Sequence, residues 1–170
     1  MKIIAFAPHS AIWEHAFPEA LIAEALQQDG HDLLYVTCGG LFKAYCIPMS
    51  AAGLTMSSSP AEKDRVCGVC KNRRTIIRKE FGFRSIDLID ILSQEDRKEV
   101  ANILKELNPQ NFMEWEIDSI PVGKYALYEF LINQKKDSTE LSAQDWIRFL
   151  PELTNALYSF FVSKKITLVH

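Results

Sequence analysis

The stretch MKIIAFAPHSAIWEHAFPEALIAEALQQDGHDLLYVT (Met1–Thr37) decides the fold. A short apolar run, Ile3–Ala7, is stopped by a proline, which is typical of a buried parallel strand. A second apolar run, Leu33–Thr37, predicts the next strand. Because the residues between these runs have helical spacing, we expect a β-α-β unit over residues 1–38 with two parallel strands.

Special residues mark the limits of the helix between these strands. Pro18 suits the first turn of a helix, where its missing N–H is not needed. Apolar residues then recur at helical spacing up to Leu26, and Gly30 suits the left-handed residue that follows a helix end. We therefore expect a loop over Pro8–Phe17, after the first strand.

The composition is that of an ordinary globular protein. The chain has 170 residues, 48% of them apolar, and a net charge of −3, which does not indicate a general nucleic-acid binder. No apolar run approaches the roughly 20 residues of a membrane-spanning helix, and the first run is too short for a signal peptide. We expect a cytoplasmic protein whose four cysteines are free thiols or metal ligands.

The rest of the chain divides into three segments. Residues 39–84 hold three cysteines and a basic cluster, residues 85–165 have helical patterns, and residues 166–170 start with the strand-like ITLV. We expect an α/β fold in one domain over residues 1–170: a Rossmann-like parallel sheet with a helix-rich, cysteine-containing insertion after the second strand. Either the last strand closes a small sheet, or this is the N-terminal half of a longer protein.

Two capping boxes predict helix starts in the helical segment. Ser93 with Asp96 and Ser142 with Asp145 have the spacing at which a hydroxyl and a carboxylate cap each other's backbone N–H groups. Pro151 is expected to divide the last helical region into two helices, because proline breaks the hydrogen-bond pattern of a helix interior.

The loop Pro8–Phe17 is the first place to look for a ligand. Open α/β sheets bind ligands beyond the carboxyl ends of their strands. A dinucleotide site needs a glycine-rich turn here and an acidic residue after the second strand, but the loop has no glycine and Cys38 follows that strand. We therefore expect no NAD site and no phosphate-binding loop.

The same loop and helix resemble the start of glycosyltransferases of the GT-B architecture. The matching residues are His15-Ala16-Phe17-Pro18, Gly30-His31 and Val36-Thr37. The resemblance implies that His15 is the general base that removes a proton from an acceptor hydroxyl, a task that suits an imidazole. It also implies substrate contacts from His9, Ser10 and Glu14. From the residues alone, His15 has a second interpretation as a helix cap or a lining residue.

The four cysteines have the spacing C-x7-C-x20-C-x2-C, over Cys38, Cys46, Cys67 and Cys70. Four thiolates can hold a structural zinc ion in tetrahedral geometry. An iron–sulfur cluster accepts the same ligands, although the sequence does not favour it. The alternative is that some of these cysteines are small core residues.

A basic run follows the last cysteine. Arg73, Arg74 and Arg78 are compatible with one helix face, which can bind phosphates or an anionic membrane surface. The alternative is a solvated face with no ligand.

Further motifs are similar to bacterial capsule and O-antigen transferases. They include Cys38-Gly39-Gly40, Phe81-Gly82-Phe83 and Val122-Gly123-Lys124-Tyr125-Ala126. The resemblance implies that Gly123, Lys124 and Tyr125 lie near the substrate, although Lys124 and Tyr125 also fit an ordinary helix start. It implies a nucleotide sugar bound mainly by an absent C-terminal donor-binding domain, a glycan acceptor, and peripheral contact with the inner membrane face.

Two functions of other classes remain open. One is a non-catalytic, zinc-stabilised module that docks on a membrane or protein through its basic helix. The other is a thiol redox protein using Cys67 and Cys70, which requires one thiol with a lowered pKa.

Overall fold

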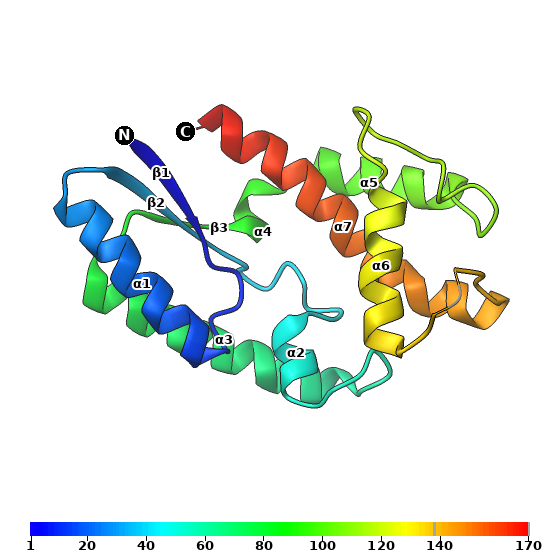
Figure 1. Ribbon diagram of the computed structural model, residues 1–170, viewed down its shortest axis with the longest axis horizontal. Helices are drawn as coiled ribbons and strands as arrows, with labels where there is room; N and C mark the ends of the chain where they lie inside the picture. Colours follow the sequence, from blue (N-terminus) through cyan, green and yellow to red (C-terminus); the bar gives the residue numbers. More distant parts are fainter. Residues whose placement is uncertain (138, 170) are drawn as a thin grey trace. The chain divides into compact units, whose positions relative to one another are not determined.

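The computed structural model describes residues 1–137 and 139–169, and their side chains as far as Ile166 (Figure 1). The chain forms two compact units, Met1–Ile91 and Leu92–Val169. The expected single domain over residues 1–170 stays a prediction. The division falls inside the segment that we expected to be helical. Each unit is described by itself.

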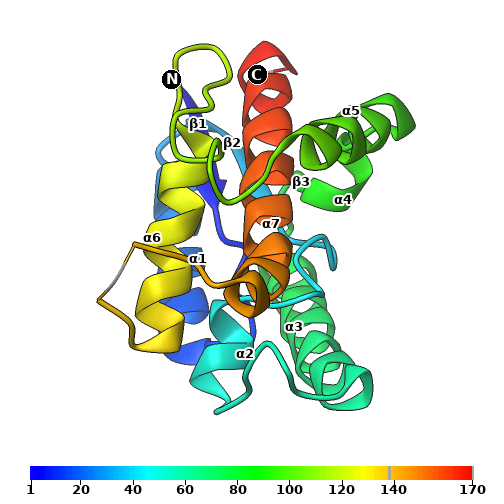
Figure 2. The same ribbon diagram turned by 90° about the vertical axis from the view of Figure 1, so that its right-hand side faces the viewer.

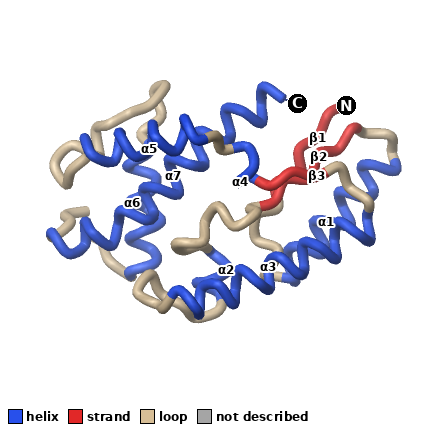
Figure 3. The backbone as a smooth tube through the Cα atoms, turned by 180° about the vertical axis from the view of Figure 1, so that it is seen from behind, coloured by secondary structure: helices blue, strands red, loops and turns tan. Residues whose placement is uncertain are grey.

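The first unit contains a parallel sheet of three strands, β1 (Lys2–Phe6), β2 (Asp32–Thr37) and β3 (Ser85–Asp87), in that order (Figure 3). β1 pairs with β2 so that Ile3 lies opposite Leu33, and β2 pairs with β3 so that Tyr35 lies opposite Ser85. The expected parallel β-α-β unit is therefore confirmed. β3 was not expected, because three residues are too few to show a strand pattern.

Two long helices, α1 (Trp13–Gln28) and α3 (Pro60–Phe81), lie on the same face of this sheet (Figures 1 and 3). Ala16, Ala20 and Ala23 of α1 are buried there, and their small side chains allow the helix to lie close to the strands. Tyr35 of β2 is fully buried in this core and stacks on Phe83, with ring centroids 4.9 Å apart.

The start of α1 differs from the expectation. The helix begins at Trp13, and Ala16 already donates a hydrogen bond to the Ile12 carbonyl, so Pro18 lies inside the helix and not in its first turn. Gly30 does adopt the left-handed conformation, with φ of +83°. The backbone N–H of His31 donates a hydrogen bond to the Leu26 carbonyl, which gives a partner to a carbonyl group at the end of the helix, as expected.

The segment after β2 contains a short helix, α2 (Ile47–Ala51), before α3. α3 begins with a capping box between Ser59 and Glu62 and connects β2 to β3. Cys67, Cys70 and the basic run therefore lie on the crossover helix of the sheet. A four-residue helix, α4 (Leu88–Ile91), follows β3 and ends this unit.

The second unit is helical, as expected. It consists of α5 (Gln94–Glu106), α6 (Val122–Gln134) and α7 (Ala143–Val169), and α6 packs along α7 (Figure 2). Its core contains the fully buried rings of Phe112, Phe130 and Phe149.

Both predicted capping boxes are formed in this unit. The Ser93 hydroxyl accepts from the Asp96 N–H at 3.2 Å, and the Asp96 carboxylate accepts from the Ser93 N–H at 2.7 Å. Ser142 and Asp145 make the corresponding pair, with the backbone N–H of Asp145 3.1 Å from the Ser142 hydroxyl.

Two expectations about the end of the chain are wrong. Pro151 does not divide α7, because Phe149 and Leu153 on either side of it are fully buried and anchor the helix. The expected strand over Ile166–Val169 is helical, and Ile166 lies one helical turn after the buried Val162. His170 lies outside the described residues. α7 has 27 residues, yet no helix in the described part of the chain is apolar enough over a sufficient length to cross a bilayer.

Candidate functional site

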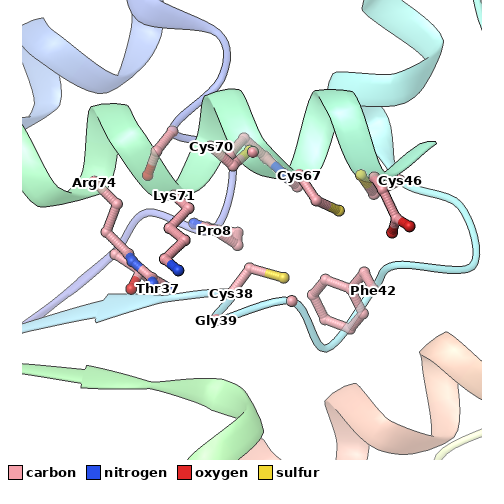
Figure 4. A pocket seen from close by; sticks show the side chains of 15 residues that line it. Pro8, Thr37, Cys38, Gly39, Phe42, Cys46, Cys67, Cys70, Lys71 and Arg74 are labelled. Atoms are coloured by element: carbon pink, nitrogen blue, oxygen red, sulfur yellow. The ribbon is translucent and has the colours of Figure 1, made fainter. Parts of the chain in front are cut away.

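A cavity of about 320 Å³ lies beyond the carboxyl ends of β1 and β2 (Figure 4). We call it the large cavity. His9 and Ser10 line it from the loop after β1, Cys38 lines it from the segment after β2, and Lys71 and Arg74 line it from α3. This is the position at which open α/β sheets bind ligands, so the ligand side predicted from the sequence contains a cavity.

All four cysteines line the large cavity. Cys38 follows β2 directly, Cys46 precedes α2, and Cys67 and Cys70 lie one turn apart on α3. Figure 4 shows the last two on the side of α3 that faces the segment after β2. The structure thus gathers four thiols, separated by up to 32 residues in the sequence, around one space.

Each of these thiols is close enough to the other three for their charges to interact. Burial raises the pKa of the Cys46 thiol to about 12, and the neighbouring thiols of Cys38, Cys67 and Cys70 add to the increase. Burial also raises the pKa values of Cys67 and Cys70, the opposite of what the thiol redox alternative requires. In the described residues, no group of three or more His, Cys, Asp or Glu side chains is arranged to hold a metal ion.

A second cavity of about 180 Å³ lies beside the start of α1, and we call it the small cavity. His9, His15 and Glu19 line it. His15 is on the first turn of α1 and is exposed, whereas His9 is half-buried and lines both cavities. Burial lowers the pKa of the His9 imidazole, which favours the neutral form of this ring.

The other residues predicted on this loop have different places. Ser10 is buried and contributes to the wall of the large cavity. Glu14 is exposed and lines neither of the two cavities.

The three predicted arginines make hydrogen bonds within their own unit. Arg74 donates to the Asp87 carboxylate at 3.0 Å, and Arg78 donates to the same carboxylate at 2.8 Å and to the Thr37 hydroxyl at 2.9 Å. Arg73 donates to the Ala11 carbonyl, and its guanidinium lies 5.7 Å from the centre of the Trp13 ring. Their role as phosphate or membrane contacts stays a prediction, and these contacts give them a structural role.

Sequence reasoning missed Asp87, which is central to this network. Asp87 ends β3 and Thr37 ends β2, and the Thr37 hydroxyl donates to the Asp87 carboxylate. The pairing of Thr37 with Asp87 could have been indicated by the polar residue that ends each strand. This signal was missed because β3 itself was not expected. Gly39 fits against Asp87: a Cβ atom on Gly39 would lie 2.6 Å from the Asp87 Cβ.

Gly123, Lys124 and Tyr125 belong to the second unit, whereas both cavities belong to the first. They form the start of α6, where Lys124 and Tyr125 are exposed. A Cβ atom on Gly123 would lie 2.1 Å from the carbonyl oxygen of Phe112. A glycine is therefore needed at position 123 because the backbone of Phe112, in the same chain, lies so close to it.

The second unit also contains a carboxyl group that the sequence did not single out. Burial in α7 raises the pKa of Glu152 to about 7, against the opposing effect of the Asn133 amide, which donates to it at 3.1 Å. Glu152 therefore titrates near neutrality.

Comparison with models of protein families, with curated proteins and with solved structures found no match for this chain.

Proposed function

We propose that this chain is the acceptor-binding part of a GT-B-type glycosyltransferase of surface-polysaccharide assembly, working in the cytoplasm. The sheet order supports this proposal, since β3-β2-β1, all parallel, is the order of the first half of a Rossmann fold. The crossover helices α1 and α3 lie on one face of the sheet, as they do in such a half.

One observation carries the proposal: His9 and His15 line the same small cavity, next to the carboxyl end of β1. An acceptor hydroxyl in this cavity has an imidazole beside it. In the proposed reaction, His15 takes the hydroxyl proton while the oxygen attacks the anomeric carbon of the donor sugar. His9 contacts the acceptor from the side that borders the large cavity.

The donor is a nucleotide sugar, held mainly by a separate C-terminal donor-binding domain. That domain stabilises the negative charge of the leaving diphosphate with fixed dipoles and cationic groups. The acceptor is a glycan or a lipid-linked glycan at the inner membrane face.

The alternative function, docking through the basic helix, gains less support. Arg73, Arg74 and Arg78 each donate hydrogen bonds to groups of the first unit, so their charges are not simply presented to a partner. Among the residues that the structure describes, no comparable observation favours the docking module.

Titration of the full chain with sugars, followed by NMR of the histidine rings, tests the proposal. The probes are a panel of monosaccharides and disaccharides, each with and without a 1-diphosphate group. Saturable shifts of the His9 and His15 signals are expected for at least one probe, because a bound hydroxyl changes the environment of both rings.

The matched variants are His15→Gln and His31→Gln. His15→Gln should weaken sugar binding at least several-fold, whereas His31→Gln should leave it unchanged, because His31 lies at the other end of α1 and lines neither cavity. Absence of shifts at both His9 and His15 with every probe would overturn the proposal.

A further inference from the structure

The strongest unassigned feature is the set of four thiols around the large cavity. They come from three separate segments: the end of β2, the residue before α2, and one turn of α3. All four lie in the wall of this one cavity of about 320 Å³.

Burial disfavours the charged form of three of these thiols when no metal is bound, but one polar contact in the structure suits a metal-bound sulfur. The backbone N–H of Ala11 donates a hydrogen bond to the Cys70 Sγ at 3.2 Å, the type of contact that stabilises thiolate ligands of metals. Lys71 and Arg74 line the same cavity (Figure 4), and Arg74 is already paired with Asp87. Four thiolates around a divalent ion carry a net charge of about −2, which the Lys71 ammonium group partly offsets.

We propose that Cys38, Cys46, Cys67 and Cys70, which line the large cavity, bind one metal centre there through four thiolates. The described side chains do not form a preformed metal site, so binding must draw the four sulfurs together. On binding, each thiol releases its proton to solvent, and each sulfur forms one bond to the metal without any change in oxidation state. Four thiolates are the ligand set of tetrahedral zinc, with bonds of about 2.3 Å, and of iron–sulfur clusters. The cavity of about 320 Å³ has room for either group.

Such a centre connects the end of β2, the start of α2 and the middle of α3. It therefore fixes the irregular segment between β2 and α3 next to His9, which lines the same cavity. The metal centre goes beyond the proposed transferase function and does not depend on it, because a chain that binds no sugar can still hold the metal.

Metal analysis of the full chain tests the proposal. The protein is purified without added metal and without oxygen, and its zinc, iron and acid-labile sulfide are measured. Portions freed of metal by chelator then receive either zinc alone or iron with sulfide. We expect about one centre per chain: zinc binding without sulfide identifies a zinc site, and iron with sulfide identifies a cluster.

Variants distinguish metal binding by the four thiols from metal binding by other side chains of the cavity. The double variant Cys67→Ser/Cys70→Ser should lose the metal. His9→Gln and Asp64→Asn, which remove the imidazole and the carboxylate that line the same cavity, should keep it. Loss of metal in either of these controls, with the chain folded, would contradict a site of four thiolates.

A second measurement covers the case in which the double variant does not fold. In the native wild-type chain, the metal should protect all four thiols from alkylation, and the chelator should expose them together. A folded wild-type chain that takes up neither zinc nor iron with sulfide, and whose thiols react equally with and without chelator, overturns the proposal.

Discussion

Thr37 and Asp87 lie opposite each other as the last residues of two neighbouring parallel strands, and the Thr37 hydroxyl donates a hydrogen bond to the Asp87 carboxylate. Arg74 and Arg78 of α3 bind the same carboxylate. This one group therefore joins the ends of β2 and β3 to the crossover helix, beside the wall of the large cavity.

Asp87→Asn should destabilise the first unit by about 2–4 kcal/mol, because it leaves two mostly buried guanidinium groups without an ionic partner. Urea unfolding followed by far-UV circular dichroism measures the change. The matched control is Asp32→Asn, whose carboxylate lies 3.3 Å from Arg84 on the same sheet but is about half exposed. Asp32→Asn should lower the free energy of unfolding by no more than about 1 kcal/mol. Equal effects of the two variants would show that the Asp87 network does not stabilise the strand ends.

Gly39→Ala should destabilise the first unit more than Gly40→Ala does. Both glycines have positive φ, +65° and +94°, so both variants strain the backbone by about 1–2 kcal/mol. Only the Gly39 variant also places a Cβ 2.6 Å from Asp87 and 2.8 Å from Ile89, which adds about 1–3 kcal/mol of overpacking. The difference between the two unfolding free energies isolates the contact, and a difference of zero would mean that Gly39 does not pack on Asp87.

Glu152→Gln should change how the stability of the chain depends on pH. Burial raises the pKa of this carboxyl from 4.5 to about 7, so the folded state holds the proton more tightly than the unfolded state. The protonated Glu152 carboxyl therefore stabilises the folded state. This stabilisation is complete below about pH 4.5 and is lost as the pH rises through about 7.

Relative to Glu152→Gln, the wild-type chain should therefore lose about 1–2 kcal/mol between pH 5 and pH 8, after allowance for solvent screening. Unfolding free energies of both proteins at the two pH values check this. Glu99→Gln, which removes an exposed glutamate of α5, should behave like the wild type. If the difference in unfolding free energy between the wild type and Glu152→Gln is the same at both pH values, the raised pKa is contradicted.

Pro151→Ala should stabilise the second unit by about 1–3 kcal/mol. Pro151 lies inside α7, where it lacks the N–H that would otherwise donate one turn back, and alanine restores this bond in a better helix former. Thermal unfolding measures the rise in Tm. Arg148→Ala is the control, since Arg148 is exposed on the same helix and both residues favour helices. A lower Tm for Pro151→Ala would mean that the proline fits a bend that α7 needs.

Local signals in the sequence were sufficient for several parts of the fold. The capping boxes at Ser93 and Ser142 formed because each hydroxyl meets a backbone N–H only three residues away. Gly30 adopted its left-handed conformation because that conformation depends on the residue itself. The pairing of β1 with β2 followed from two apolar runs joined by one helix.

The sequence alone also determined which residues are available for chemistry. These are His9 after the first apolar run, His15 six residues later, and four cysteines with an unusual spacing. Tertiary structure decided where they act. It recruited three residues as β3, kept α7 continuous through Pro151, and placed His9 between two cavities. It also brought the four cysteines to one cavity and surrounded Asp87 with two arginines. These features depend on contacts between residues far apart in the chain, whose free energies come from packing and charge pairing, and no short stretch of sequence contains both partners.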